Sequence, residues 1–221
     1  MPLAAFLWDL DGTLVDTAAL HLAAWQAMEP HLGRPFTHDD FRTTFGWRNP
    51  EIFHYLAPGR WTAEQMQMLG ELKESAYRAA VRQQGVVLLP GVQALLTAAA
   101  SAGLRQAIAS SAPRANLELI LEITGAAHFF AALVGMEDTQ RGKPDPQVFL
   151  LAAERLGVPA SRCLVFEDAV AGVQAAKAGG MRCVAIARPG HHPPERLQAA
   201  GADLVVASLE KLDFETLRGL D

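Results

Sequence analysis

A short apolar run that ends in two aspartates constrains this chain more than any other segment. Residues 4–8 (AAFLW) predict a buried strand, and Asp9 and Asp11 follow it closely. Gly12 and Thr13 then break the strand and open a turn. Carboxylates at the end of a buried strand are costly unless a cation or a proton compensates them. The segment therefore indicates a chemically active site.

The spacing of the two aspartates allows two arrangements. If the strand continues, Asp9 and Asp11 present their side chains on the same face, because alternate residues of a strand do so. If the strand has ended, the two carboxylates can divide the roles of nucleophile and acid/base. Both arrangements place two acids at the carboxyl end of one strand.

The residues after this strand carry helical rather than strand periodicity. Apolar residues recur at helical spacing over residues 20–28, with Thr17 as the expected N-cap. Two short helices are expected within residues 37–56, and a long helix over residues 63–84 that Thr62 caps. This block without strands predicts a small helical domain inserted directly after the acidic loop.

Strand and helix patterns alternate over the rest of the chain. Strands are expected at residues 104–109, 131–134, 162–166, 181–186 and 203–206, and helices at residues 91–101, 113–123, 146–156 and 170–178. Such alternation predicts a parallel sheet with right-handed crossovers. Ligands of such sheets bind at the carboxyl ends of the strands.

Composition excludes several classes of function. Half of the 221 residues are hydrophobic, which is ample for a large core, and the net charge of −5 without a basic block argues against nucleic-acid binding. Cys163 and Cys183 lack metal-type spacing and fit a reduced compartment. The N-terminus lacks signal-peptide features, and Pro90-Gly91 interrupts the longest apolar stretch, residues 86–104. We expect a cytoplasmic, monomeric protein without membrane partners.

Polar residues follow four of the expected core segments. They are Asp9 and Asp11, Ser110 and Ser111, Lys143, and Glu167 and Asp168. In a parallel sheet these positions converge at one edge. Carboxylates can hold Mg²⁺ through oxygen ligands, and a hydroxyl with an ammonium can hold phosphate. The combination suits phosphoryl transfer, in which catalysis is mostly positioning and charge neutralisation.

In sequence order, these segments resemble the four motifs of the haloacid dehalogenase superfamily. The matching segments are residues 9–13 (DLDGT), Ser110, residues 142–146 (GKPDP), and Glu167-Asp168 followed by Gly172 and Gly179. The match covers essentially the whole chain, and four motifs in order are far more specific than an isolated Asp-x-Asp. The resemblance implies an α/β fold, with a Rossmann-like parallel-sheet core of residues 1–16 and 87–221 and an inserted helical cap of residues 17–86.

The resemblance also implies a role for each matched acid. Asp9 would be the nucleophile that forms an aspartyl-phosphate. Asp11 would be the general acid and then the general base. Mg²⁺ would be bound by Asp9, the Asp11 carbonyl and Asp168, with Glu167 nearby or in the outer shell.

Ser110, with Ser111 beside it, and Lys143 would bind the phosphate by the same resemblance. Simpler structural roles remain open for these motifs. Ser110 can cap the helix that follows, Glu167-Asp168 can be an N-cap pair, and Lys143 can be an exposed turn residue. The order of the motifs favours the catalytic interpretation.

Four residues of the cap are candidate substrate contacts. His21 and Trp25, together with residues 16–17, resemble the β-phosphoglucomutase-like branch of sugar-phosphate enzymes, and Arg48 and Lys73 are candidates to hold a phosphate or carboxylate of the substrate. The alternatives are a partly buried polar residue for His21, a cap-core residue for Trp25, and solvated charges for Arg48 and Lys73. Arg114 is similarly open, and we interpret His191-His192 as a surface loop.

We expect a Mg²⁺-dependent phosphatase that acts on a small phosphorylated metabolite, most simply a sugar phosphate. β-Phosphoglucomutase is the alternative, because it uses the same core and returns the phosphoryl group to a sugar. Residues 45–50 (FGWRNP) depart from the mutase hinge and put a second phosphate site in doubt. A non-catalytic binding protein is disfavoured, because a competent residue fills every catalytic position.

Overall fold

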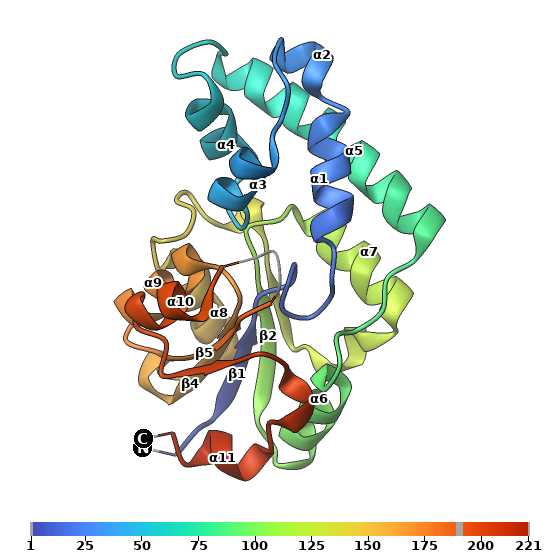
Figure 1. Cartoon of the computed structure of the whole chain (residues 1–221). Coiled ribbons are helices and arrows are strands. Elements are labelled where there is room, and N and C mark those ends of the chain that lie inside the picture. Colours follow the sequence, from blue (N-terminus) through green and yellow to red (C-terminus); the bar gives the residue numbers. More distant parts are fainter. Residues whose placement is uncertain (1, 189–191, 221) are drawn as a thin grey trace.

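A parallel sheet of six strands forms the centre of the computed structural model, which describes residues 2–188 and 192–220 (Figure 1). The strands are β1 (Ala5–Trp8), β2 (Arg105–Ala109), β3 (Ala132–Val134), β4 (Cys163–Glu167), β5 (Arg182–Ile186) and β6 (Leu204–Val206). Their order is β3-β2-β1-β4-β5-β6, and every neighbouring pair is parallel. This α/β Rossmann-like architecture confirms the predicted fold class.

Helices cover both faces of the sheet. They are α6 (Val92–Ser101), α7 (Arg114–Thr124), α8 (Gln147–Leu156), α9 (Val170–Ala178), α10 (Pro194–Ala199) and α11 (Phe214–Arg218), with 3-10 helices η1 (Ala126–Phe129), η2 (Met136–Asp138), η3 (Ala160–Arg162) and η4 (Leu209–Lys211). Along β1, Phe6 and Trp8 pack with the α6, α7 and α11 side, whereas Ala5 and Leu7 pack with the α8, α9 and α10 side. This alternation fixes the register of the central strand.

Five helices lie between β1 and α6 and form the cap above the carboxyl ends of the strands (Figure 1). They are α1 (Ala18–Gln26), α2 (Glu29–Leu32), α3 (His38–Thr44), α4 (Asn49–Leu56) and α5 (Ala63–Gln84). The cap has a hydrophobic cluster of its own, which includes Trp25, Phe36 and Phe53. The inserted helical cap is thus present, and the residue limits of the two domains stay predictions.

The structure adds elements that the sequence patterns did not predict. Helix α2 follows the helical pattern of residues 20–28 and contains Pro30 in its first turn, where proline is tolerated. Helices α10 and α11 are short and lie in segments without a clear apolar period. Across the described residues, no helix is both long enough and apolar enough to span a bilayer. His191 of the predicted surface loop lies outside the described residues.

Candidate active site

The first cluster of the site is a buried lysine surrounded by acids at the carboxyl ends of β1 and β4. The Lys143 ammonium donates hydrogen bonds of 2.6 Å to Asp9 Oδ1 and of 2.6 Å to Glu167 Oε1. Carboxylate oxygens of Asp9, Glu167 and Asp168 lie within 4.8 Å of one another. The structure therefore brings four of the predicted residues, from three distant segments, into one cluster.

Two glycines allow the acids to come this close. Gly12 has a φ of +87°, and a Cβ at this position would clash with the Asp168 carboxylate. Gly172 lies in α9, and a Cβ there would clash with the Glu167 carboxylate. Both glycines belong to segments matched by the motifs, and their role here is to leave room for carboxylate groups.

The charge of this cluster is not balanced by the protein. Burial raises the pKa of Asp9 well above its usual value, against the influence of Lys143, and the nearby Glu167 and Asp168 raise it further. Burial and the Glu167 charge likewise raise the pKa of Asp168. Three buried carboxylates outnumber the nearby cations, Lys143 and, for Asp168, Arg188, and leave an excess of negative charge that a divalent cation with oxygen preference would neutralise. The donor set therefore fits Mg²⁺.

The Glu167 carboxylate is already engaged by protein donors on both oxygens. Its Oε1 accepts from Lys143, and its Oε2 accepts at 2.7 Å from the backbone N–H groups of Asp168 and Ala169. Glu167 thus fixes the loop that carries Asp168, in keeping with the nearby or outer-shell position expected for it. The open helix-cap alternative does not describe the pair, since α9 has Ala169 as its N-cap.

Ser110 and Ser111 follow β2 and line the pocket beside Asp9 and Asp11. Ser110 is buried, and its Oγ accepts from the Ala112 N–H at 3.1 Å. It does not cap α7, whose N-cap is Pro113. The Ser110 O–H remains available as a donor toward the pocket, where a phosphoryl oxygen would need one.

Asp11 does not join the acidic cluster, because residues from the cap side hold its carboxylate. Its Oδ1 accepts from the Thr17 hydroxyl at 2.5 Å and from the Tyr77 hydroxyl at 3.2 Å, and lies 3.2 Å from His21 Nε2. Thr17 does precede α1, but its hydroxyl serves Asp11 instead of the predicted helix cap. Burial favours a raised pKa for Asp11, but His21 and Thr17 outweigh burial and lower it.

The hydrogen-bond chain fixes the tautomer of His21. Lys73 Nζ lies 2.8 Å from His21 Nδ1, and an ammonium can only donate. His21 Nδ1 therefore accepts, so the ring proton is on Nε2 and points to Asp11. Lys73 is only 2% exposed, which contradicts the solvated charge that we considered for it.

Glu74 balances Lys73 and connects the cap to the core. Its Oε1 accepts from Lys73 and from Asn49 Nδ2, both at 2.9 Å, and its Oε2 accepts from Asn116 Nδ2 at 2.7 Å. Asn116 belongs to α7 of the core, whereas Glu74 belongs to α5 of the cap. Sequence reasoning missed Glu74, Asn49, Asn116 and also Tyr77, because single polar residues on helices carry no motif.

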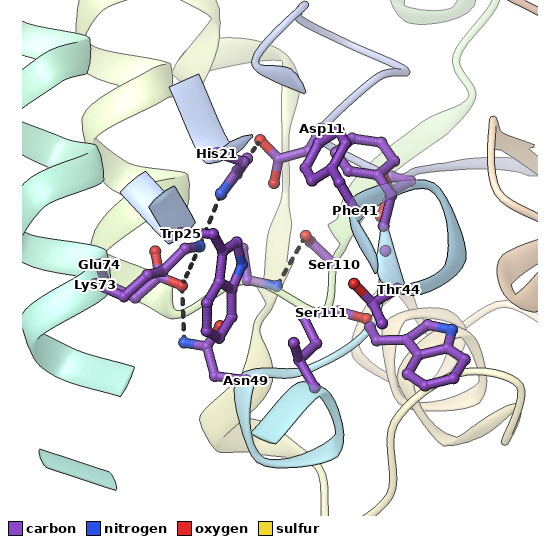
Figure 2. Close-up of a pocket in the computed structure, with 16 residues that line it drawn as sticks. Asp11, His21, Trp25, Phe41, Thr44, Asn49, Lys73, Glu74, Ser110 and Ser111 are labelled. Atoms are coloured by element: carbon purple, nitrogen blue, oxygen red, sulfur yellow. Dashed lines mark hydrogen bonds and ion pairs between the residues drawn. The ribbon is translucent and has the colours of Figure 1, made fainter. Parts of the chain in front are cut away.

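The pocket between cap and core is lined by sixteen residues (Figure 2). The core side presents the acids and serines already described, and the cap side presents an aromatic and aliphatic wall with a few polar groups. Trp25 is 2% exposed and stacks on Phe36, so it is a residue of the cap core and of the pocket wall at once. The cavity measures about 50 Å³ and lies between cap and core, so movement of the cap would change the space that a substrate can occupy.

Arg48 does not line this pocket, and its role as a substrate contact stays a prediction. Its Nη2 donates to the Met136 carbonyl of the core at 3.2 Å, and its Cδ lies where a side chain on Gly142 would be. Arg114 is likewise engaged, with Asp138 at 2.7 Å. Arg48 therefore packs the cap against the loop that carries Lys143.

A family model described as haloacid dehalogenase-like hydrolase matches residues 3–180. Protein CbbY of Rhodobacter capsulatus is 33% identical over an alignment of 193 positions that covers 83% of this chain and 85% of the relative. A β-phosphoglucomutase of Bacillus subtilis is 32% identical over an alignment of 219 positions that covers 96% of this chain and 93% of the relative.

A solved structure of similar fold has a bound sugar bisphosphate. It is a CbbY mutant from Rhodobacter sphaeroides in complex with xylulose-1,5-bisphosphate, with a TM-score of 0.85 and 25% identity. The alignment covers 95% of this chain and 96% of that chain.

Proposed function

Because the chain belongs to the haloacid dehalogenase-like hydrolase family, we propose that it is a Mg²⁺-dependent phosphatase of small phosphate monoesters, most simply sugar phosphates, that works through an aspartyl-phosphate. The observation that carries this proposal is the joining of Asp9 to Lys143, Glu167 and Asp168 directly below a pocket that also contains Asp11 and Ser110. Two of the similar proteins support a sugar-phosphate substrate. One is named β-phosphoglucomutase, and the other was solved in complex with a sugar bisphosphate.

Asp9 is the nucleophile of the proposed first step. A carboxylate oxygen of Asp9 attacks phosphorus, the bond from phosphorus to the ester oxygen breaks, and the leaving oxygen takes a proton from Asp11. Lys143 holds Asp9 Oδ1, which fixes the rotamer of the nucleophile and offsets negative charge near the phosphoryl group. Ser110 donates its hydroxyl hydrogen to a phosphoryl oxygen.

Asp11 then acts as the base. Water attacks phosphorus, the bond from phosphorus to Asp9 breaks, and Asp11 takes the proton from water. Its pKa is lowered in this arrangement, so Asp11 is ionised and ready for this second step. A bound phosphate dianion beside Asp11 raises the pKa of this carboxyl, which supports the protonated form that the first step needs.

Mg²⁺ would be held by Asp9 and Asp168, with Glu167 in support, and would supply charge neutralisation for the phosphoryl oxygens. The excess of buried carboxylates is the observation that supports this assignment. The Asp11 carbonyl stays a predicted ligand.

The proposal is tested with p-nitrophenyl phosphate and with a panel of sugar phosphates. We expect phosphate release that requires Mg²⁺, stops on chelation and returns when Mg²⁺ is added back. Brief reaction followed by acid quench and mass spectrometry should show a phosphate adduct on the peptide that contains Asp9. A folded protein that releases no phosphate from any ester under these conditions would refute the proposal.

β-Phosphoglucomutase is the second candidate, and the connection of Asp11 to the cap favours it. A mutase must exclude water from the aspartyl-phosphate, and the Asp11–His21–Lys73 chain ties the acid/base to the closed cap. The deciding assay supplies β-glucose 1-phosphate with a trace of glucose 1,6-bisphosphate and follows glucose 6-phosphate and free phosphate. We expect free phosphate; rapid isomerisation with negligible phosphate release would make the mutase correct.

A further inference from the structure

We infer that the substrate is a phosphate monoester whose leaving group carries no second anionic group, and that the Glu74 carboxylate excludes such groups. The inference rests on the proposed function, because it concerns the leaving-group side of the same pocket. It rests on the charged groups that line that side of the pocket and on the hydrogen-bond partners that those groups already have.

The cap contributes an apolar wall to the pocket, beside its polar groups. Its apolar members are Trp25, Phe41, Phe45, Trp47 and Ile52. Trp25 is fixed by stacking on Phe36 at 5.2 Å and by an edge contact with Phe53, so this wall keeps its shape. Such a wall favours the carbon face of a sugar or another neutral alcohol and offers an anion nothing.

The cations near the pocket are already engaged. Among the described residues that line it, Lys73 is the lysine or arginine present, and its ammonium donates to His21 and Glu74. The same ammonium lies 5.5 Å from the Trp25 ring and 5.6 Å from the Tyr77 ring, so aromatic faces border its remaining side. Among the described residues that line the pocket, a second phosphate on the substrate would therefore find no ammonium or guanidinium that is not already engaged.

Glu74 neutralises the Lys73 ammonium on this side of the pocket, so the pair offers an anion no net attraction while its carboxylate repels one. It is buried, lines the pocket, and receives three hydrogen bonds, from Lys73, Asn49 and Asn116. Because these donors hold it in the ionised form, a carboxylate or second phosphate placed beside it meets like charge in a site without bulk water. Like-charge contacts of this kind are a strong basis for rejecting a ligand.

This arrangement separates the chain from the relative that was solved with a bisphosphate. That CbbY structure contains xylulose-1,5-bisphosphate, so its pocket accommodates two phosphates. Here Arg48 of the cap does not line the pocket; its Nη2 donates to the Met136 carbonyl, and its buried Nε has no partner among the described residues. We therefore expect the two proteins to differ in substrate charge although they share a fold.

The experiment compares matched esters that differ in one charged group. One pair is glucose 6-phosphate and 6-phosphogluconate, and the other is glycerol 3-phosphate and 3-phosphoglycerate; p-nitrophenyl phosphate is the reference. We expect kcat/KM for the neutral member of each pair to exceed that of the carboxylate member by at least about tenfold. Equal values, or a preference for the carboxylate members, would overturn the inference while leaving the phosphatase proposal intact.

Glu74→Gln tests the residue itself. The amide keeps the shape and one acceptor oxygen but removes the charge, so we expect the neutral-to-carboxylate ratio to fall about tenfold toward one. Glu71→Gln is the matched control, because Glu71 lies on the same helix with a side chain that is 66% exposed and contacts Arg78. Its ratio should equal that of the unchanged protein.

Two further results decide between explanations. If Arg48→Met selectively lowered activity toward carboxylate esters, a second-anion contact would exist and the inference would be wrong. If Glu74→Gln does not fold, as judged by circular dichroism, the ratio in the unchanged protein still decides the substrate class. No phosphate release from any ester, including p-nitrophenyl phosphate, would refute the proposed function and this inference with it.

Discussion

The two sides of the site both bury a lysine among acids, but their charges balance differently. On the core side, Lys143 faces the carboxylates of Asp9, Glu167 and Asp168. On the cap side, Lys73 faces Glu74 alone, and asparagines and His21 complete the hydrogen bonds. The core side therefore carries excess negative charge, whereas the cap pair is neutral.

This difference teaches what each side can bind. Buried charge without compensation is costly, so the core side is stabilised by a divalent cation and by the protonation of its acids. The cap side is complete without any ion, so it adds shape and hydrogen bonds but no affinity for charge. Four predictions test this contrast, in decreasing order of expected effect on turnover.

Asp9→Asn should abolish turnover, with a loss of at least about 10⁴-fold. The amide has nearly the shape of the carboxylate, so the fold is retained, but it cannot attack phosphorus or form an aspartyl-phosphate. Phosphate release and mass spectrometry after acid quench measure both losses. Asp39→Asn is the matched control, since the Asp39 side chain is 81% exposed and contacts Arg42. Substantial turnover by folded Asp9→Asn would contradict the mechanism.

Asp11→Asn should lower kcat by about 10²–10⁴-fold, the usual contribution of a general acid or base. Asparagine retains an oxygen that can accept from Thr17, Tyr77 and His21, so the closed cap should persist. The Mg²⁺ concentration for half-maximal rate should stay the same. A large shift in that concentration would show that the Asp11 carboxylate serves the metal instead.

Asp168→Ala should raise the Mg²⁺ concentration for half-maximal rate by about 10–100-fold, because it removes a core-side carboxylate. The unchanged protein should gain thermal stability on addition of Mg²⁺, and Asp168→Ala should gain far less. Glu74→Gln should keep the full gain, since the cap side holds no ion. Equal stabilisation of all three proteins by Mg²⁺ would contradict the contrast between the two sides.

Glu74→Gln should change turnover of neutral esters least and should alter acid stability instead. Burial alone would raise the pKa of Glu74, but Lys73, His21 and Asn116 outweigh burial and hold it at about 2, below the usual 4.5. A lowered pKa in the folded state contributes stability above about pH 4.5 that is lost as the pH falls toward 2. Urea unfolding at several pH values should show the contribution of Glu74 shrinking by about 3 kcal/mol over this range.

The stability contribution of the core-side acids should change with pH in the opposite direction to that of Glu74. The raised pKa values of Asp9 and Asp168 mean that these acids destabilise the metal-free protein at neutral pH and that protonation relieves this cost as the pH falls. Measuring the pH dependence of the free energy of unfolding of Asp9→Asn and of Glu74→Gln in the absence of Mg²⁺ therefore distinguishes the two sides. Parallel pH dependence of the two variants would show that their charges are not balanced as described.

The sheet was predictable because each strand is a short apolar run bounded by turn residues. All six strands were expected near their observed positions. The motif residues Asp9, Glu167 and Asp168 end or follow strands that converge at one edge, where Lys143 from the loop before α8 joins them. Because the carboxyl ends of parallel strands lie at one edge of the sheet, residues that are far apart in sequence can be predicted to lie close together there.

The cap side was less predictable, because the positions of its side chains depend on which helix face is buried and on how the cap contacts the core. Glu74 and Asn116 belong to helices of different domains, and nothing in either segment indicates that they meet. Arg48 has the charge expected of a phosphate ligand, yet the start of α4 directs it to a core carbonyl. Lys73 was identified as a candidate, but its burial depends on packing that sequence periodicity does not specify.

The contact between Asn116 and Glu74 makes the position of the cap observable without any label. The Asn116 amide donates to Glu74 of the cap while its carbonyl oxygen accepts from Arg78 at 3.1 Å. In a nuclear magnetic resonance spectrum, the two side-chain amide protons of a residue held in this way differ in shift from those of an asparagine in water. Exchange broadening of this pair of signals would report how often the cap opens, and titration with an ester would show whether binding slows that opening.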